Sequence, residues 1–301
     1  MWRYYVMRLS YVLLGWLPLR FLYVFARIAG DAAFLLRSGV RRDVIGNMRQ
    51  VMGPQAAERE VRRAAREAFR NATRYYADLF HIPHMDSERF SKERLDLAGL
   101  EYLEEAKRSG CGAVVVSAHF GNPEMAVQGV AAAGYPVLGL TEPLQPPQLS
   151  EFTDWLRSRH GNEYLSVGFG AVKEAIRRIK RGGIVALLVD RDVGGTGVPM
   201  RFCGAETAMP LGAVDLALRT GAFLIPAWAW RIDGYRMCVR IGPPLDLVRT
   251  GDAERDVRTN GERLLALVEE RLRSDPGQWA VLEAIWRKPD GGPAASLGAV
   301  Q

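Results

Sequence analysis

One bend of the chain carries a histidine and a glutamate five positions apart, in the stretch "VVVSAHFGNPEMA" at residues 114–126. His119 follows an apolar run typical of a buried strand, and Glu124 stands at the start of the next helix. A tight strand-to-helix bend can bring the two together, so that Glu124 accepts a hydrogen bond from one imidazole nitrogen while the other acts as a base. The pair contains no nucleophile. We therefore expect the proton to come from a substrate hydroxyl, with Gly121 and the free amides of the helix start near the oxyanion formed when that hydroxyl attacks a carbonyl.

The other residues of the bend also fit a purely structural interpretation. Asn122 is a good helix N-cap, and Pro123 suits the first helical position. An acid such as Glu124 is favoured in the first turn by the helix dipole. His119 is the residue that capping leaves unexplained.

A second histidine has the same spacing to an acid, so spacing alone does not identify the base. His81 precedes Asp86 in "LFHIPHMDSE", after a helical stretch and far from any predicted strand end. A loop or helix-terminal role is the simpler interpretation there. The same stretch can also be interpreted as metal ligands, but no further ligand residues support that. Position therefore favours His119.

A second group of charged residues follows another apolar run. Asp190, Arg191 and Asp192 come directly after "IVALLV" and before a glycine-rich turn. They can form a mutual salt-bridge cluster. Alternatively, Arg191 binds an anionic group while Asp190 orients it or contacts a sugar hydroxyl.

Other kinds of site lack their signatures. Ser117 is not in a G-x-S-x-G elbow, which disfavours a serine hydrolase. The pair Gly168 and Gly170 lacks the third glycine of a dinucleotide-binding loop, where Lys173 stands. The three cysteines contain no C-x-x-C pair and indicate free thiols in a reducing, cytoplasm-facing protein: Cys111, Cys203 and Cys238. We expect no metal and no resident cofactor.

The elements that position these residues alternate between strand and helix. The predicted strands cover 113–117, 136–140, 164–167, 184–189, 222–228 and 237–242. Long helices are expected over 56–80 and 254–273, a shorter helix ends at Gly110, and a polar break is expected over Arg41–Asn47. Continuous apolar strands predict an α/β fold with a mixed, largely parallel central sheet flanked by helices. Chemistry in such sheets gathers at the carboxyl ends of strands, where both charged groups fall.

The N-terminal segment is both basic and apolar. Residues 1–74 hold fourteen arginines, no lysine and five acids, a net of +9, whereas the whole chain carries +6. Because the arginines are interleaved with aromatic and aliphatic residues, an anionic membrane surface is a better partner than nucleic acid. The longest uncharged run, Leu9 to Leu19, is too short to span a bilayer, which takes about 20 apolar residues.

We therefore expect interfacial helices rather than a spanning one, on the cytoplasmic face of the plasma membrane. The aromatic residues expected at headgroup level are Trp2, Tyr4, Tyr5, Trp16 and Tyr23. The alternative is a helix packed only on its own domain. The predicted organisation is a membrane-associating segment over 1–40, an α/β domain over 41–290 and a disordered tail over 291–301.

Several ordered motifs together resemble those of the bacterial lipid acyltransferases, which include the lipid A lauroyl and myristoyl transferases and the phosphatidylinositol mannoside acyltransferases. The resemblance covers nearly the whole chain. It rests on "AHFGNPE", "DRD", "GVPMRFCGAETAMPLGAVDLALRTGAFLIPAWAW" and "DPGQWAVLEAIW".

This resemblance implies acyl transfer from acyl-CoA or acyl carrier protein to a hydroxyl of a membrane glycolipid or lysophospholipid, with either a mannoside-like or a lipid A-like acceptor. It implies His119 as general base and Glu124 as its orienting partner. It places the substrate-binding residues at Asn122, Arg157, Asp190 and Arg191. The alternative functions are a non-catalytic lipid-binding homologue and a thioester or lipid hydrolase.

Overall fold

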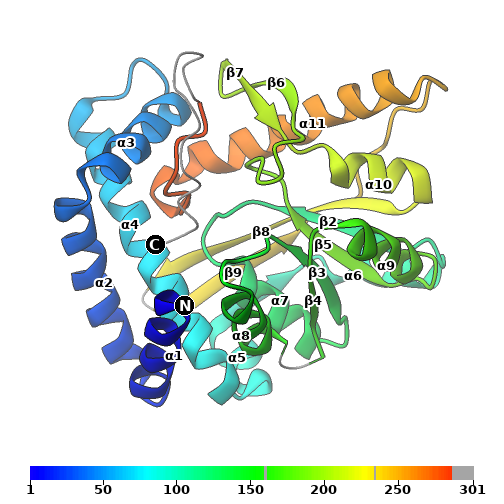
Figure 1. Cartoon of the computed structure of the whole chain (residues 1–301). Coiled ribbons are helices and arrows are strands. Elements are labelled where there is room, and N and C mark those ends of the chain that lie inside the picture. The colour runs from blue at the N-terminus through cyan, green and yellow to red at the C-terminus, as the bar shows by residue number, and fades with distance from the viewer. Residues whose placement is uncertain (159–160, 234, 287–301) are drawn as a thin grey trace.

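A seven-stranded sheet forms the centre of the computed structural model, which describes residues 1–158, 161–233 and 235–286 (Figure 1). Its strand order is β1-β9-β8-β2-β5-β3-β4. Strands β8, β2, β5, β3 and β4 are parallel, whereas β9 runs antiparallel to β8 and β1 runs parallel to β9. The strands are β1 Leu95–Ala98, β2 Ala113–Ser117, β3 Val137–Thr141, β4 Glu163–Ser166, β5 Ile184–Leu188, β8 Phe223–Asp233 and β9 Arg236–Ile241. The predicted mixed, largely parallel sheet is confirmed.

Helices cover both faces of the sheet. They are α1 Trp2–Leu14, α2 Leu19–Leu36, α3 Ser38–Met52, α4 Glu58–His81, α5 Ser87–Arg94, α6 Leu100–Arg108, α7 Pro123–Ala132, α8 Pro147–Arg157, α9 Phe169–Ile179, α10 Gly212–Thr220 and α11 Ala253–Ser274. Two short 3-10 turns are η1 Ile82–His84 and η2 Pro276–Gln278. The alternation of β2 divides the core: Val114 and Val116 pack with Val214 of α10, whereas Ala113 packs with Leu103 of α6 and Met125 of α7.

Two sequence-based expectations about elements are wrong. The polar break over Arg41–Asn47 is instead part of α3, because Val40, Val44, Met48 and Val51 form one buried helical face. The division expected at residue 40 falls within this helix and stays a prediction. The second error is a missed hairpin, β6 Val198–Phe202 and β7 Ala205–Met209, which pairs as a separate two-stranded sheet. The tail predicted over 291–301 lies outside the described residues.

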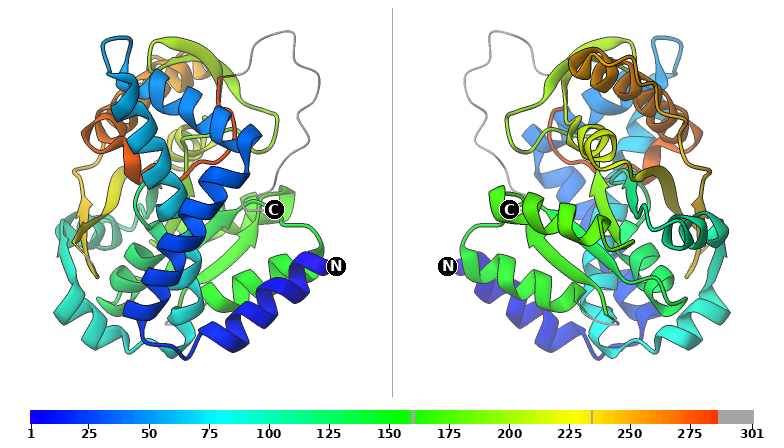
Figure 2. Two further views of the ribbon diagram at one scale, coloured as in Figure 1. Left: turned by 90° about the vertical axis from the view of Figure 1, so that its left-hand side faces the viewer. Right: turned by 90° about the vertical axis from the view of Figure 1, so that its right-hand side faces the viewer.

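The helices α1 and α2 lie together on one side of the molecule, which faces the viewer in the left panel of Figure 2. Helix α2 packs along α4, where Gly30 is required because a Cβ would lie 2.7 Å from the Arg70 Cα. Asp31 pairs with Arg66 and Arg70 at 2.8 and 2.7 Å, and these hydrogen bonds hold the pKa of its carboxyl well below the usual range. The N-terminal segment therefore forms two helices, of which α2 is fixed to α4, and its association with a membrane stays a prediction.

Both helices turn apolar side chains outward at helical spacing. The exposed set comprises Trp2, Tyr5, Val6, Leu9, Val12 and Leu13 on α1, Trp16 between the helices, and Phe21, Val24, Phe25, Ile28, Leu35 and Leu36 on α2. Within the described residues, no helix is both long enough and apolar enough to cross a bilayer. Tyr23 differs from the expected headgroup position, since its hydroxyl points inward to Asp78 at 2.5 Å.

Candidate active site

The His119 imidazole lies against a buried carboxylate from the neighbouring strand end. Its Nδ1 is 2.9 Å from Asp190 Oδ1, and its backbone N–H donates to Asp190 Oδ2 at 3.0 Å. Asp190 has no exposed side-chain surface, while the side chain of His119 is 30% exposed. The base candidate thus faces outward, and its supporting acid is shielded from water.

Strand register explains this meeting. Strands β2 and β5 are parallel neighbours, and Ser117 is aligned with Leu188. His119 and Asp190 each come two residues later and therefore leave the sheet side by side. Sequence analysis put both at strand ends but gave Asp190 another role. The register between two distant strands was the missing information.

The charge state of this pair favours a base at the other nitrogen. Burial alone would raise the pKa of Asp190, but the imidazole and the hydrogen bonds from Trp279 and the His119 backbone outweigh it, so that the pKa lies below its ordinary value. An ionised Asp190 holds the proton on Nδ1 of His119. The lone pair is then on Nε2, where it can accept a proton.

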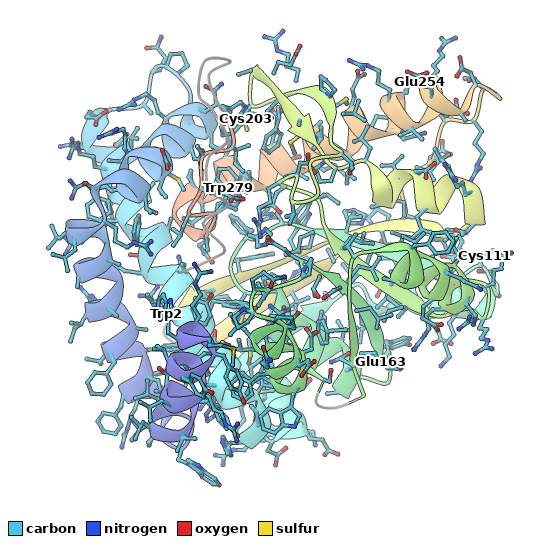
Figure 3. All side chains as sticks on the ribbon, viewed as in Figure 1. Trp2, Cys111, Glu163, Cys203, Glu254 and Trp279 are labelled. Carbon is cyan, nitrogen blue, oxygen red and sulfur yellow. The ribbon has the colours of Figure 1, made fainter. Side chains whose placement is uncertain are left out.

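The C-terminal segment fastens this pair from the other side. Trp279 is fully buried, and its indole N–H donates to Asp190 Oδ2 at 2.7 Å. Figure 3 shows Trp279 in the interior, between α4 and the sheet. The backbone of Ala280 donates to the His119 carbonyl at 2.8 Å, and Gly121 donates to the Gln278 carbonyl at 2.9 Å. The "DPGQW" stretch therefore has a structural role that its sequence alone did not reveal.

Gly121 is fixed by close backbone packing as well. Its φ is +63°, and a Cβ there would lie 2.1 Å from the Ala229 carbonyl oxygen. Its amide is used by Gln278, and those of Glu124 and Met125 are used by the Asn122 cap. The expected oxyanion site at these amides is therefore wrong, because all three already have acceptors within the protein.

Glu124 has different partners from those expected. Its Oε2 accepts from the Tyr164 hydroxyl at 2.8 Å, and its Oε1 lies 3.1 Å from the Arg157 Nε. The carboxylate that contacts the imidazole is Asp190 and not Glu124, so the predicted hydrogen bond of the motif pair is wrong. The first turn of α7 places the Glu124 side chain against Arg157 of α8, whereas His119 contacts Asp190.

The two side chains of this ion pair are mostly buried, at 13% exposure for Glu124 and 14% for Arg157. Arg157 also donates to the Tyr75 hydroxyl at 2.6 Å. Burial would lower the pKa of Arg157, but the nearby Glu124 carboxylate and the tyrosines raise it above its ordinary value. Arg157 is therefore a charged group already neutralised by the motif acid.

Asn122 caps α7, as predicted. Its Oδ1 accepts from the amides of Glu124 and Met125 at 3.1 and 3.3 Å, and its Nδ2 donates to Asp78 Oδ2 at 2.7 Å. The residue has no exposed surface. Its hydrogen bonds therefore fix the turn at residues 119–124 from the buried side.

Arg191 bridges two segments at the edge of the site. Its guanidinium donates to Glu142, after β3, at 2.7 Å and to Glu283, in the C-terminal segment, at 2.6 Å. Asp192 accepts from the Gly197 amide at 2.8 Å. Asp190, Arg191 and Asp192 thus each contact different partners rather than forming a mutual salt-bridge cluster.

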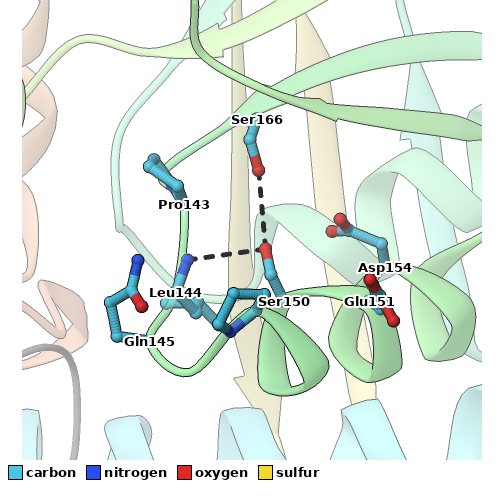
Figure 4. A pocket seen from close by; sticks show the side chains of 8 residues that line it. Pro143, Leu144, Gln145, Ser150, Glu151, Asp154 and Ser166 are labelled. Atoms are coloured by element: carbon cyan, nitrogen blue, oxygen red, sulfur yellow. Dashed lines mark hydrogen bonds between the residues drawn. The ribbon is translucent and has the colours of Figure 1, made fainter.

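A pocket of about 240 Å³ lies beside Glu142, at the carboxyl ends of β3 and β4 (Figure 4). It opens at the same edge of the sheet as His119. In Figure 4 the Ser150 hydroxyl lies between the Leu144 amide and the Ser166 hydroxyl, at 3.4 Å from each. Its lining residues are Pro143, Leu144, Gln145, Pro147, Ser150, Glu151, Asp154 and Ser166.

The second histidine motif has the expected structural role. His81 is the last residue of α4, and Asp86 caps α5 by accepting from the Arg89 amide at 3.0 Å. His84 stacks on the Tyr11 ring with 5.7 Å between ring centres. All three cysteines are free, as expected.

The residues that sequence analysis missed are mainly aromatic. Tyr75, Tyr164 and Trp279 place a polar group on Arg157, Glu124 or Asp190. Each comes from an element distant in sequence. The available signal was the tendency of buried Tyr and Trp to find a hydrogen-bond partner, which does not say which partner.

Known proteins support the resemblance. The profile of a family described as bacterial lipid A biosynthesis acyltransferase matches residues 1–288. A phosphatidylinositol mannoside acyltransferase of Mycobacterium tuberculosis is 29% identical over 283 residues, covering 90% of this chain and 86% of the relative. One from Mycolicibacterium smegmatis is 29% identical over 261 residues, covering 85% and 82%.

Among solved structures, a 1-acyl-sn-glycerophosphate acyltransferase, PlsC, from Thermotoga maritima aligns with a TM-score of 0.36 at 13% identity. The alignment covers 87% of this chain and 98% of that one.

Proposed function

Because the chain belongs to the bacterial lipid A biosynthesis acyltransferase family and is an acyltransferase, we propose that it acylates a membrane glycolipid or lysophospholipid. The donor is an acyl thioester, either acyl-CoA or acyl carrier protein. The acceptor is a hydroxyl of a mannoside-like or lipid A-like lipid. The observation that carries the mechanism is the buried Asp190 on Nδ1 of a partly exposed His119.

In this mechanism Nε2 of His119 takes the proton of the acceptor hydroxyl as its oxygen attacks the thioester carbonyl carbon. A tetrahedral intermediate forms and collapses with cleavage of the carbon–sulfur bond. The proton on Nε2 passes to the leaving thiolate, which regenerates neutral His119. Asp190 stabilises the imidazolium between the two transfers and keeps the ring in the required tautomer.

In this proposal the motif acid, Glu124, does not contact the base, His119. Glu124 neutralises Arg157 and fixes it against α7, so that both shape the site without contacting the imidazole. Asn122 fixes the turn by capping, and Arg191 ties the β3 end to the C-terminal segment.

We further propose that the protein attaches peripherally to the cytoplasmic face of the plasma membrane. Two observations support this: the outward apolar stripes of α1 and α2, and exposed arginines beside them, including Arg8, Arg20 and Arg27. Apolar surface at the acyl boundary and basic groups at anionic headgroups are the features of interfacial helices. A water-insoluble acceptor also has to be reached at that surface.

The test is acyl transfer by the purified protein from a labelled acyl thioester to a membrane lipid extract. His119→Ala should lower the rate at least about 100-fold, the usual contribution of a general base, without a change in circular dichroism. His81→Ala is the matched control, because it removes the other histidine with the same motif spacing. Unchanged transfer in His119→Ala refutes the assigned base. Thiol release that is equal with and without acceptor identifies a hydrolase instead.

A further inference from the structure

One aromatic side chain of α2 points away from the apolar stripe and into the protein. Its neighbours Val24 and Phe25 are exposed, whereas the Tyr23 hydroxyl donates to Asp78 Oδ1 at 2.5 Å. The same hydroxyl accepts from the Arg231 guanidinium at 2.7 Å. Tyr23 therefore joins α2 to α4 and to β8 through one buried polar group.

The centre of this group is a buried ion pair. Asp78 and Arg231 contact each other directly, with side-chain exposures of 1% and 8%. Asp78 Oδ2 also accepts from the Asn122 amide at 2.7 Å. Because Asn122 caps α7 three residues after His119, the polar group extends from α2 to the turn that carries the base.

Arg231 reaches the same turn by a second route. Its backbone N–H donates to Gln278 Oε1 at 2.8 Å, and its carbonyl accepts from Gln278 Nε2 at 3.1 Å. The Gln278 carbonyl in turn accepts from the Gly121 amide at 2.9 Å. The His119 turn is thus held at Gly121 and at Asn122, and both attachments lead to Arg231.

We propose that Tyr23 is a positioning residue, whose hydroxyl makes the apolar N-terminal helix and the His119 turn one hydrogen-bonded unit. The proposal rests on the proposed role of His119 as the base. A shift of α2 removes a donor from Asp78 and an acceptor from Arg231. Both are buried, and a buried charged group that loses a hydrogen-bond partner is destabilised, so we expect each side chain to shift toward its remaining partners. The remaining partner of Asp78 on the turn is Asn122, so a shift of Asp78 displaces the residue that caps α7.

The test uses the full chain with Tyr23→Phe, which removes only the hydroxyl. Tyr235→Phe is the matched control, because its ring stacks on Tyr23 at 5.3 Å between centres and is 38% exposed. The first readout is amide hydrogen exchange at Glu124 and Met125, whose N–H groups bond to the Asn122 cap. We expect exchange at these amides to be about 10-fold faster in Tyr23→Phe than in the wild type, since local opening sets the exchange rate. In the control the exchange rate should not change.

The second readout is the acyl-transfer rate. Displacement of the base should lower kcat about 10-fold in Tyr23→Phe and leave KM within about twofold, because the misplaced group acts in the chemical step. Asn122→Asp tests the other end of this connection independently, because an aspartate keeps the capping oxygen for Glu124 and Met125 but has no N–H to donate to Asp78. It should reproduce both changes even if Tyr23→Phe folds poorly.

Exchange at Glu124 and Met125 that is unchanged in either variant overturns the proposal. Equal changes in Tyr235→Phe also overturn it, because loss of a neighbouring tyrosine hydroxyl would then have the same effect as loss of the one that contacts Asp78 and Arg231. The exchange readout does not depend on turnover. A wild-type protein that transfers no acyl chain therefore refutes the proposed function, while the exchange result still decides the role of Tyr23.

Discussion

The two sides of the turn at residues 119–124 hold their carboxylates in different ways. On one side, Asp190 has no exposed surface and contacts His119 through both the ring and the backbone. On the other side, Glu124 is paired with Arg157 and Tyr164. The first acid comes from a strand 71 positions along the chain, and the second belongs to the motif itself.

This difference shows that two residues close together in a sequence motif need not contact each other in the structure. Glu124 stands near His119 along the chain, but a helix start turns its side chain toward α8. Asp190 is distant in sequence and adjacent in space, because parallel strands in register end together. The carboxylate that contacts the proposed base is therefore Asp190, which lies beyond the end of β5.

The largest expected effect is on the Asp190 side. Asp190→Asn should lower kcat about 1,000-fold, because an asparagine amide can donate to Nδ1 and so stabilise the tautomer with the proton on Nε2. A neutral residue also fails to stabilise the imidazolium. Steady-state acyl transfer at pH 7 measures the loss.

The control for this change is Asp192→Asn, two residues further along the same strand end. Asp192 accepts from the Gly197 amide, whereas the carboxylate that His119 contacts is that of Asp190. We expect its kcat within about threefold of wild type, as for a surface turn. A rate above one tenth of wild type in Asp190→Asn contradicts the assignment of the supporting acid.

A change on the Glu124 side should act mainly on stability. Glu124→Gln leaves the Arg157 charge buried without its partner, and breaking such a pair costs about 3 kcal/mol. The second change Arg157→Gln should restore a large part of that loss, because no uncompensated charge remains. Urea unfolding of wild type, the single variant and the double variant measures both effects.

The matched control is Glu58→Gln, whose carboxylate pairs with Arg49 and Arg62 at the surface. We expect a much smaller loss of stability there than in Glu124→Gln, because solvent screens this exposed pair. In the folded state, kcat of Glu124→Gln should fall about 10-fold, well short of Asp190→Asn. If it falls as far as Asp190→Asn while stability is unchanged, the two sides of the turn have the opposite roles.

The sequence predicted most elements because their patterns are local. The strand 113–117 matches β2 residue for residue, and Asn122 caps α7 as its type and place indicate. The site was predicted only in part. His119 and Asp190 were both placed at strand ends, but their contact depends on register, which no short window of sequence contains.

The hairpin of β6 and β7 was missed although its turn has a local sequence pattern. Cys203 and Gly204 have φ of 48° and 86° between two strands. Two consecutive positive values are the requirement of a tight I′ hairpin turn, and cysteine is an unusual residue for it. Glycine alone was a weak signal there, so the predicted strands did not include residues 198–209.

The smallest expected effect concerns the C-terminal segment. It tests whether this segment positions Asp190 through the hydrogen bond from Trp279 or through the packing of its side chains. Trp279→Phe keeps an aromatic ring but removes the indole N–H that donates to Asp190 at 2.7 Å. The two N–H contacts from His119 remain, so kcat should fall only about 10-fold, with KM unchanged. Trp286→Phe is the matched control, because its indole N–H donates at 3.1 Å to the Phe202 carbonyl and not to a carboxylate. Both variants remove one donor from the same C-terminal segment. A similar loss of kcat in both would mean that packing of this segment, and not its hydrogen bond to Asp190, sets the geometry of the base. A loss confined to Trp279→Phe would extend the contrast between the two carboxylates to the segment that holds one of them.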